Sequence, residues 1–251
     1  MTRRLLALLL LAAQPAAAQQ PGTTDWRTAA PLLPLDGPTR MVRQPVTIGG
    51  EAWGPWRRVC REQTLRPGRP PQRDCLAVTE ARPEGDGVRL TLRHEPTGLL
   101  IAAQRGVDGR IGTFEAVRAD GTAPPEDARR AALLSAWREQ FATLSLEGRR
   151  IAPNDQFPLP VEGSPRGGIC RPDSTGMIGG RPVLVARCAV ELAGRLRGGE
   201  SDARVAIFAR VAIDVATGMV SAQGYATRIE TFAANGRSNG VVVTPSRVVL
   251  E

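Results

Sequence analysis

The chain contains a single histidine, His94, at a point where a strand is predicted to end. The residues before it alternate between apolar and polar, with Val88, Leu90 and Leu92 in one phase. His94 continues that phase, so its side chain is expected to point toward the core beside Glu95. An imidazole next to a carboxylate can act as a general base, which makes His94 a candidate catalytic residue. The alternative is a structural histidine whose ring is hydrogen-bonded near the following turn.

Four cysteines, Cys60, Cys75, Cys170 and Cys188, could form disulfides, bind a metal or carry out thiol redox chemistry. They show no C-x-x-C spacing and lie far in sequence from His94, which argues against a metal site or a redox dithiol. In an oxidising compartment an even number of cysteines usually forms disulfides. We predict the pairs Cys60–Cys75 and Cys170–Cys188, because short spacings make encounter easier. We expect no metal and no cofactor.

A cluster of arginines lies in and around the loop that Cys60 and Cys75 would close. Its members are Arg57, Arg58, Arg61, Arg66, Arg69 and Arg73, with Glu62 as the one acid among them and Trp53 and Trp56 just before. One interpretation is a docking surface for an anionic envelope surface, with arginines on phosphate or carboxylate groups. The alternative is a solvated basic loop, since all 33 basic residues of the chain are arginine and the net charge of +8 reflects that bias.

The first residues predict export from the cytosol. Arg3 and Arg4 precede the apolar residues 5–13, and alanines at 16–18 offer a cleavage site, so residues 1–18 are expected to be a signal peptide. The mature chain would be periplasmic or secreted, and we expect no nucleic-acid partner there. No later apolar run reaches the roughly 20 residues that a spanning helix needs, so we expect no transmembrane segment in the mature chain.

Alternating apolar and polar residues predict a mainly β protein. We expect two related, curved antiparallel meanders, in the manner of a half-barrel, with one packed amphipathic helix. Residues 19–39, rich in Pro, Gly and Thr, would form a linker or an extended arm. Residues 40–122 would form the first β half, residues 123–144 the helix, and residues 145–251 the second β half with a C-terminal edge strand.

The helix is predicted over about residues 125–143. Prolines and acidic residues stand where a helix N-terminus favours them. Apolar side chains then recur at spacings of three and four: Leu133, Leu134, Trp137, Phe141 and Leu144. We expect Trp137 and Phe141 to be buried against a sheet.

The two β halves share a turn signature and a pair of cysteines. Thr97-Gly98 in the first half matches Thr217-Gly218 in the second, and each half holds its own cysteine pair. A tandem duplication accounts for both similarities. Coincidence is the alternative, because Thr-Gly turns are common in β proteins.

The second half carries the segment 151–158 and a strand that ends in the turn Asp214-Val215-Ala216-Thr217-Gly218. Over about residues 145–232 it resembles exported bacterial β-proteins, themselves uncharacterised, with a D-x-x-T-G closing hairpin. The resemblance implies an architecture similar to the half-barrel of periplasmic lipoprotein carriers, and it implies no catalytic residue. This chain differs from the lipoprotein members because Ala18 is followed by Gln19 and not by a cysteine that could carry a lipid.

Two functions follow as hypotheses. The first is an exported, non-enzymatic binding or scaffold protein for an apolar or amphipathic ligand or an envelope partner, because a curved sheet covered by one helix leaves a concave apolar space. The second is an envelope hydrolase that uses His94. An enzyme should place His94 in a cleft with a second polar group within hydrogen-bond reach. A carrier should show an elongated apolar cavity instead.

Overall fold

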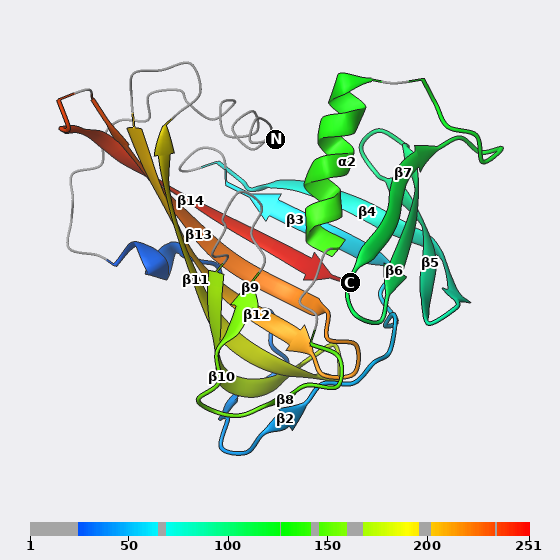
Figure 1. Ribbon diagram of the computed structural model, residues 1–251, viewed down its shortest axis with the longest axis horizontal. Helices are drawn as coiled ribbons and strands as arrows, with labels where there is room; N and C mark the ends of the chain where they lie inside the picture. Colours follow the sequence, from blue (N-terminus) through cyan, green and yellow to red (C-terminus); the bar gives the residue numbers. More distant parts are fainter. Residues whose placement is uncertain are drawn as a thin grey trace.

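The computed structural model describes residues 25–64, 69–125, 127–141, 146–159, 168–195, 202–233 and 235–251. The expected signal peptide, residues 1–18, and Arg66 of the arginine cluster lie outside the described residues. The described chain is mainly β, with one α-helix and one short 3-10 helix (Figure 1).

Strands follow one another along nearly the whole chain. The first half contains β1 (Arg40–Met41), β2 (Val46–Thr47), β3 (Arg58–Gln63), β4 (Gln72–Glu84), β5 (Gly87–His94), β6 (Leu100–Gly106) and β7 (Ile111–Val117). The second half contains β8 (Arg150–Ile151), β9 (Phe157–Leu159), β10 (Gly168–Ile178), β11 (Arg181–Arg195), β12 (Asp202–Asp214), β13 (Val220–Phe232) and β14 (Ser238–Leu250). The helices are η2 (Trp26–Ala29) and α2 (Ala128–Phe141).

Almost all strands join one antiparallel sheet. Its order is β1-β10-β11-β12-β13-β14-β3-β4-β5-β6-β7, with β9 also paired to β10, while β2 and β8 form a separate two-stranded sheet. Each half is therefore a meander of five consecutive strands, β3 to β7 and β10 to β14. Figure 1 shows the sheet bending strongly between the two halves, and the strand order leaves it open, with β1 and β7 at its ends. The expected pair of curved meanders with one packed helix is confirmed.

The C-terminal strand β14 was predicted to lie at the edge of the sheet, and this prediction is wrong. It pairs with β13 on one side and with β3 on the other, for example Val249 with Ala222 and with Cys60. Its apolar residues fall in runs, Val241-Val242-Val243 and Val248-Val249-Leu250, rather than in strict alternation. Val248 and Leu250 are buried while Val242 is 47% exposed, and the prediction relied only on the place of the strand in the sequence.

Helix α2 covers the inner face of the first meander. Asp127 caps it, because its Oδ1 accepts hydrogen bonds from the backbone N–H groups of Arg129 and Arg130 at 2.7 and 3.1 Å. Trp137 and Phe141 are buried, as predicted, among Leu90, Leu92, Ile101 and Phe114 of strands β5 to β7. Arg138 donates to the carbonyls of Ile111 and Gly112 on strand β7, at one end of the sheet order. The helix thus covers both a face and an edge.

The second meander has a core on each of its faces. Leu184, Ala186 and Cys188 of β11 alternate with residues of the other face and point into the same core as Val211 and Ile213 of β12. Residues of the opposite phase, among them Val183 and Ala222, form a smaller cluster on the outer face.

Residues 25–39, expected to be a linker or an arm, lie along that outer face. Leu33 and Leu35 pack on the outer cluster, and the N–H of Asp36 donates to the carbonyl of Met177 at 2.9 Å. Gly224 of β13 lets this arm approach, because a Cβ there would lie 2.0 Å from the carbonyl oxygen of Pro31. The described arm is therefore a fixed part of the fold.

Candidate functional site

His94 ends strand β5 and begins a tight turn over residues 94–99, called here the His94 turn. The N–H of Gly98 donates to the carbonyl of His94 at 2.8 Å, and the N–H of His94 donates to the carbonyl of Leu99 at 2.8 Å. The left-handed φ of +71° at Gly98 makes glycine the favoured residue there. The turn holds the imidazole in a buried position, with His94 only 4% exposed.

Both ring nitrogens of His94 have side-chain partners. Nδ1 lies 2.7 Å from Oγ1 of Thr97, and Nε2 lies 2.6 Å from Oδ1 of Asp74 on strand β4. The other carboxylate oxygen of Asp74 accepts two hydrogen bonds from Arg61 at 2.7 and 3.0 Å. The Arg61 guanidinium also lies 4.4 Å from the ring centroid of Trp137, so the buried helix residue is part of the same cluster.

The three side chains are arranged as in a catalytic triad, with a hydroxyl, a base and an acid that orients the base. Thr97, His94 and Asp74 could pass a proton from the hydroxyl to the imidazole while the carboxylate stabilises the charged ring. The nearby backbone N–H groups, however, are used within the turn: that of Gly98 by His94, and that of Leu99 by Oγ1 of Thr97 at 3.4 Å. Both N–H groups are thus engaged within the turn. An oxyanion hole would need N–H donors that point at the substrate.

A pocket of about 670 Å³ opens beside the His94 turn, and we call it the His94 pocket. Its walls are the turn, the end of β7 and the N-terminal part of α2. The apolar lining includes Leu99, Leu100, Val117 and Leu133. Among the residues that the structure describes, the charged lining consists of three arginines, Arg118, Arg129 and Arg130, and one acid, Asp127. An apolar pocket edged by more cations than anions favours a ligand with an apolar part and a negative charge.

The second meander repeats the turn at residues 214–219, the Asp214 turn. The N–H of Gly218 donates to the carbonyl of Asp214 at 2.9 Å, and the N–H of Asp214 to the carbonyl of Met219 at 2.8 Å. Oδ1 of Asp214 accepts from Oγ1 of Thr217 at 2.9 Å, where His94 contacts Thr97. The flanking registers agree as well, since Leu76 pairs with His94 and Val183 pairs with Asp214.

The partner residues on the preceding strand also correspond. The carbonyl of Cys75 accepts from the N–H of Glu95, and that of Pro182 accepts from the N–H of Val215. The residues just before these carbonyls are Asp74, which contacts His94, and Arg181, whose Nε donates to Asp214 at 2.6 Å. The two turns therefore hold the same pair with its acidic and basic positions exchanged. The hydrogen bond and charge of Asp214 raise the pKa of Arg181.

The disulfides follow the predicted pairing. Cys60 is bonded to Cys75 and Cys170 to Cys188, with Cα–Cα distances of 4.2 and 4.0 Å. Each bridge joins residues directly opposite in neighbouring antiparallel strands, where Cα atoms come closest. The bridges do not occupy equivalent places, however. Cys75 corresponds to Pro182, and Cys188 lies farther along β11 from the turn. The similarity of the halves thus lies in the turns and strand order, not in the cysteines.

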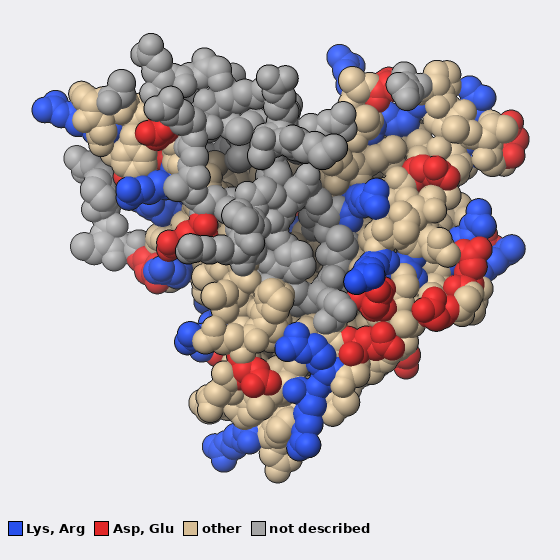
Figure 2. Space-filling view, viewed as in Figure 1, with Lys and Arg blue, Asp and Glu red and all other residues tan. Residues whose placement is uncertain are grey.

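The described arginines of the cluster are paired with acids from β4, from the His94 turn and from the residue that follows β14. Arg58 binds Glu95 at 2.7 Å, Arg61 binds Asp74, and Arg73 binds Glu251 at 2.5 Å. The hydrogen bond from Arg58 lowers the pKa of Glu95. Arg57 and Arg69 are exposed. On the face shown in Figure 2, basic and acidic side chains lie interspersed over the described surface. Sequence alone located the arginines but not their acidic partners, two of which, Glu95 and Glu251, are far away in sequence.

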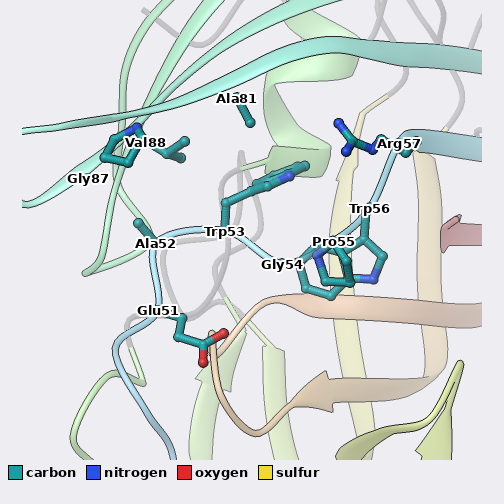
Figure 3. Close-up of a pocket in the computed structure, with 11 residues that line it drawn as sticks. Glu51, Ala52, Trp53, Gly54, Pro55, Trp56, Arg57, Ala81, Gly87 and Val88 are labelled. Atoms are coloured by element: carbon teal, nitrogen blue, oxygen red, sulfur yellow. The ribbon is translucent and has the colours of Figure 1, made fainter.

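A second pocket of about 470 Å³ surrounds Trp53 in the segment before β3 (Figure 3). The ring of Trp53 stacks on Phe141 of α2 at 6.2 Å between centroids and meets Trp56 edge-on at 5.6 Å. Buried Arg105 donates to the carbonyl of Ala52 at 2.8 Å, and burial lowers its pKa to about 10. These contacts fix the tryptophans in the core against the helix.

One serine motif was not among the candidates above. Residues 236–240, Gly-Arg-Ser-Asn-Gly, match G-x-S-x-G, which in α/β-hydrolases carries a nucleophile on a turn from a strand to a helix. Here the motif runs from the turn after β13 into the first residues of β14, so a strand and not a helix follows the turn. Ser238 begins β14, and its Oγ accepts from the N–H of Gly240 at 3.3 Å. The context differs from a nucleophile elbow.

The chain matches no protein-family model and no curated protein sequence. The resemblance to half-barrel lipoprotein carriers therefore stays a prediction. Within the part of the chain that the structure describes, no helix is both long and apolar enough to cross a membrane.

Proposed function

We propose that the protein is a non-enzymatic binding protein of the cell envelope and that the His94 pocket is its ligand site. The repetition of the turn carries this proposal. The Asp214 turn reproduces the hydroxyl contact, the backbone hydrogen bonds and the ion pair of the His94 turn without any imidazole. The same set of contacts occurs in both turns, and only one of the turns contains a base. We therefore take these contacts to stabilise the turn rather than to serve catalysis. His94 then has a structural role at the wall of the pocket.

The pocket lining supports an amphipathic ligand of negative charge. Leu99, Leu100 and Leu133 would contact its apolar part, while the arginines at 118, 129 and 130 attract its anionic part. Two disulfides support an oxidising compartment such as the periplasm. Both features agree with an exported protein that meets envelope molecules.

The test uses 8-anilinonaphthalene-1-sulfonate, a fluorescent probe with an aromatic body and a sulfonate. We expect its fluorescence to rise on binding and its dissociation constant to increase at least tenfold in Leu133→Asp, which places a carboxylate in the pocket wall. Ser135→Asp is the matched control, because Ser135 is exposed on the same helix and outside the pocket lining. Circular dichroism must show that both variants fold. Equal binding by the two variants would contradict the proposed site.

A hydrolase is the second candidate, favoured by the contacts of His94 with Thr97 and Asp74 beside a pocket. Hydrolysis of p-nitrophenyl esters separates the two functions. A hydrolase would lose activity in both Thr97→Val and His94→Gln. If the protein only binds a ligand, we expect the wild type to hydrolyse the ester no faster than the Thr97→Val variant.

A further inference from the structure

The Asp214 turn is covered by a segment of the chain itself. Residues 48–51, called here the cover segment, run across it in extended form. The N–H of Gly49 donates to the carbonyl of Val215 at 2.7 Å, and the N–H of Glu51 donates to the carbonyl of Ala216 at 3.0 Å. The side chain of Ile48 is buried over the turn, with Cγ2 only 3.2 Å from where a Cβ on Gly218 would lie.

The His94 turn presents the same groups, and within the described part of the chain no segment covers it in this way. Glu95 and Pro96 correspond to Val215 and Ala216, and among the described residues no backbone N–H donates to their carbonyls. A Cβ on Gly98 would meet no atom within 4 Å, in contrast with Gly218 under Ile48. Thr97 and Gly98 are exposed, whereas Thr217 and Gly218 are buried. The His94 pocket lies against this open turn.

We infer that the His94 pocket receives an extended peptide segment of a partner protein, which binds as the cover segment binds the Asp214 turn. This inference rests on the proposed function and names its ligand class. Two peptide N–H groups, two residues apart, would donate to the carbonyls of Glu95 and Pro96. An aliphatic side chain before the first of them would lie over Gly98 and enter the apolar pocket beside Leu133.

The cover segment also defines the ligand's sequence. Gly49 follows the aliphatic residue, and a Cβ at this position would lie 2.6 Å from the carbonyl oxygen of Ala216. The partner segment therefore carries an aliphatic residue followed by glycine. The three arginines of the pocket favour a segment of acidic net charge. A lipid acyl chain could fill the apolar space but has no N–H groups for the two carbonyls.

The experiment uses the folded protein and a blocked peptide with the sequence of residues 46–52, Val-Thr-Ile-Gly-Gly-Glu-Ala. Amide chemical shifts in ¹H–¹⁵N spectra report where the peptide binds. We expect shifts at Thr97, Gly98 and Leu99, displacement of the sulfonate probe, and no shifts at the Asp214 turn, which the tethered cover segment already occupies. Two matched peptides test the mechanism: one with alanine in place of the first glycine, and one methylated on the nitrogen of that glycine.

Both altered peptides are expected to bind at least tenfold more weakly, as is the unaltered peptide to Leu133→Asp. Equal affinity of all three peptides would overturn the inference, because neither the N–H group nor the missing Cβ would then matter. If the sulfonate probe binds and Leu133→Asp weakens it while the peptide causes no shifts, the peptide inference fails and the proposed function stands. If Leu133→Asp leaves the probe unaffected, the proposed function fails first.

Discussion

His94 and Asp214 occupy the same position in two matching turns, and each binds a side chain of opposite character on the preceding strand. The acid is on the strand in one half, as Asp74, and on the turn in the other, as Asp214. Exchanging the two positions keeps the attraction but changes which residue must be buried. Asp214 is 1% exposed, while its partner Arg181 reaches toward solvent and also binds Glu51.

This relationship predicts the effect of His94→Asp. The variant reproduces the Asp214 side chain at the His94 turn but places it against the carboxylate of Asp74, with only Arg61 to balance both. We expect the free energy of unfolding to fall by on the order of 3 kcal/mol, as for a buried charge that loses its partner. The additional change Asp74→Asn should restore most of the loss. Urea denaturation measures both, and a stable single variant would contradict the equivalence of the two turns.

Trp137 ties helix α2 to the first meander. Trp137→Ala is expected to cost roughly 3 to 5 kcal/mol, the usual range for removal of a buried aromatic side chain. Trp137→Phe keeps most of the apolar contact and should cost clearly less. Denaturant titrations monitored by circular dichroism give both values. Equal losses for the two variants would contradict this expectation, because a benzyl ring would then recover none of the contact that the indole makes.

Gly224 admits the arm to the outer face. Gly224→Ala should cost about 1 to 3 kcal/mol through overpacking against the carbonyl of Pro31. It should also speed tryptic cleavage after Arg27 in the arm. Gly112→Ala in β7 is the control, because its new Cβ would meet only the flexible side chain of Gln104, at 3.3 Å. Unchanged cleavage in Gly224→Ala would mean that the arm is held elsewhere.

Asp127 caps α2 at the edge of the His94 pocket. Hydrogen bonds from the N–H groups of Arg130 and Arg129 lower the pKa of its carboxyl from the ordinary 3.8. A lowered pKa in the folded state adds stability above the ordinary value, and this stability is lost as the pH falls through the lowered pKa. Asp127→Ala should therefore destabilise the protein at neutral pH and converge with the wild type in strong acid. Asp127→Asn, which still caps, should differ little from the wild type at neutral pH, as thermal melts over this pH range would show.

The sequence predicted the local features well. Alternation predicted the β-rich fold, and the spacing of Trp137 and Phe141 located the buried helix face, because these patterns depend on neighbours in the chain. Short loops also made the two disulfides predictable.

The features that involve distant segments were not predictable. The acids that bind Arg58, Arg61 and Arg73 include Glu95 and Glu251, far away in sequence and adjacent only through strand pairing. The place of β14 was missed for the same reason. A concave apolar space between sheet and helix was expected, but its location was not, since it depends on how α2 lies against the His94 turn.

The position of β14 has a consequence for folding. Val59 near the start of the sheet pairs with Leu250 at the end of the chain, so the contact that joins the two meanders has one of the largest sequence separations available to the molecule. Such contacts are slow to form, because the chain between them must first be ordered. As the chain emerges from the ribosome or a translocon, β3 can pair with β4 early but with β14 only after β14 has been synthesised. Until then one edge of β3 is unpaired and can pair with a wrong strand. A chain without the last dozen of these residues would lose nearly all of β14 and leave β13 and β3 each with an unpaired edge, so the joining of the two meanders depends on this one strand.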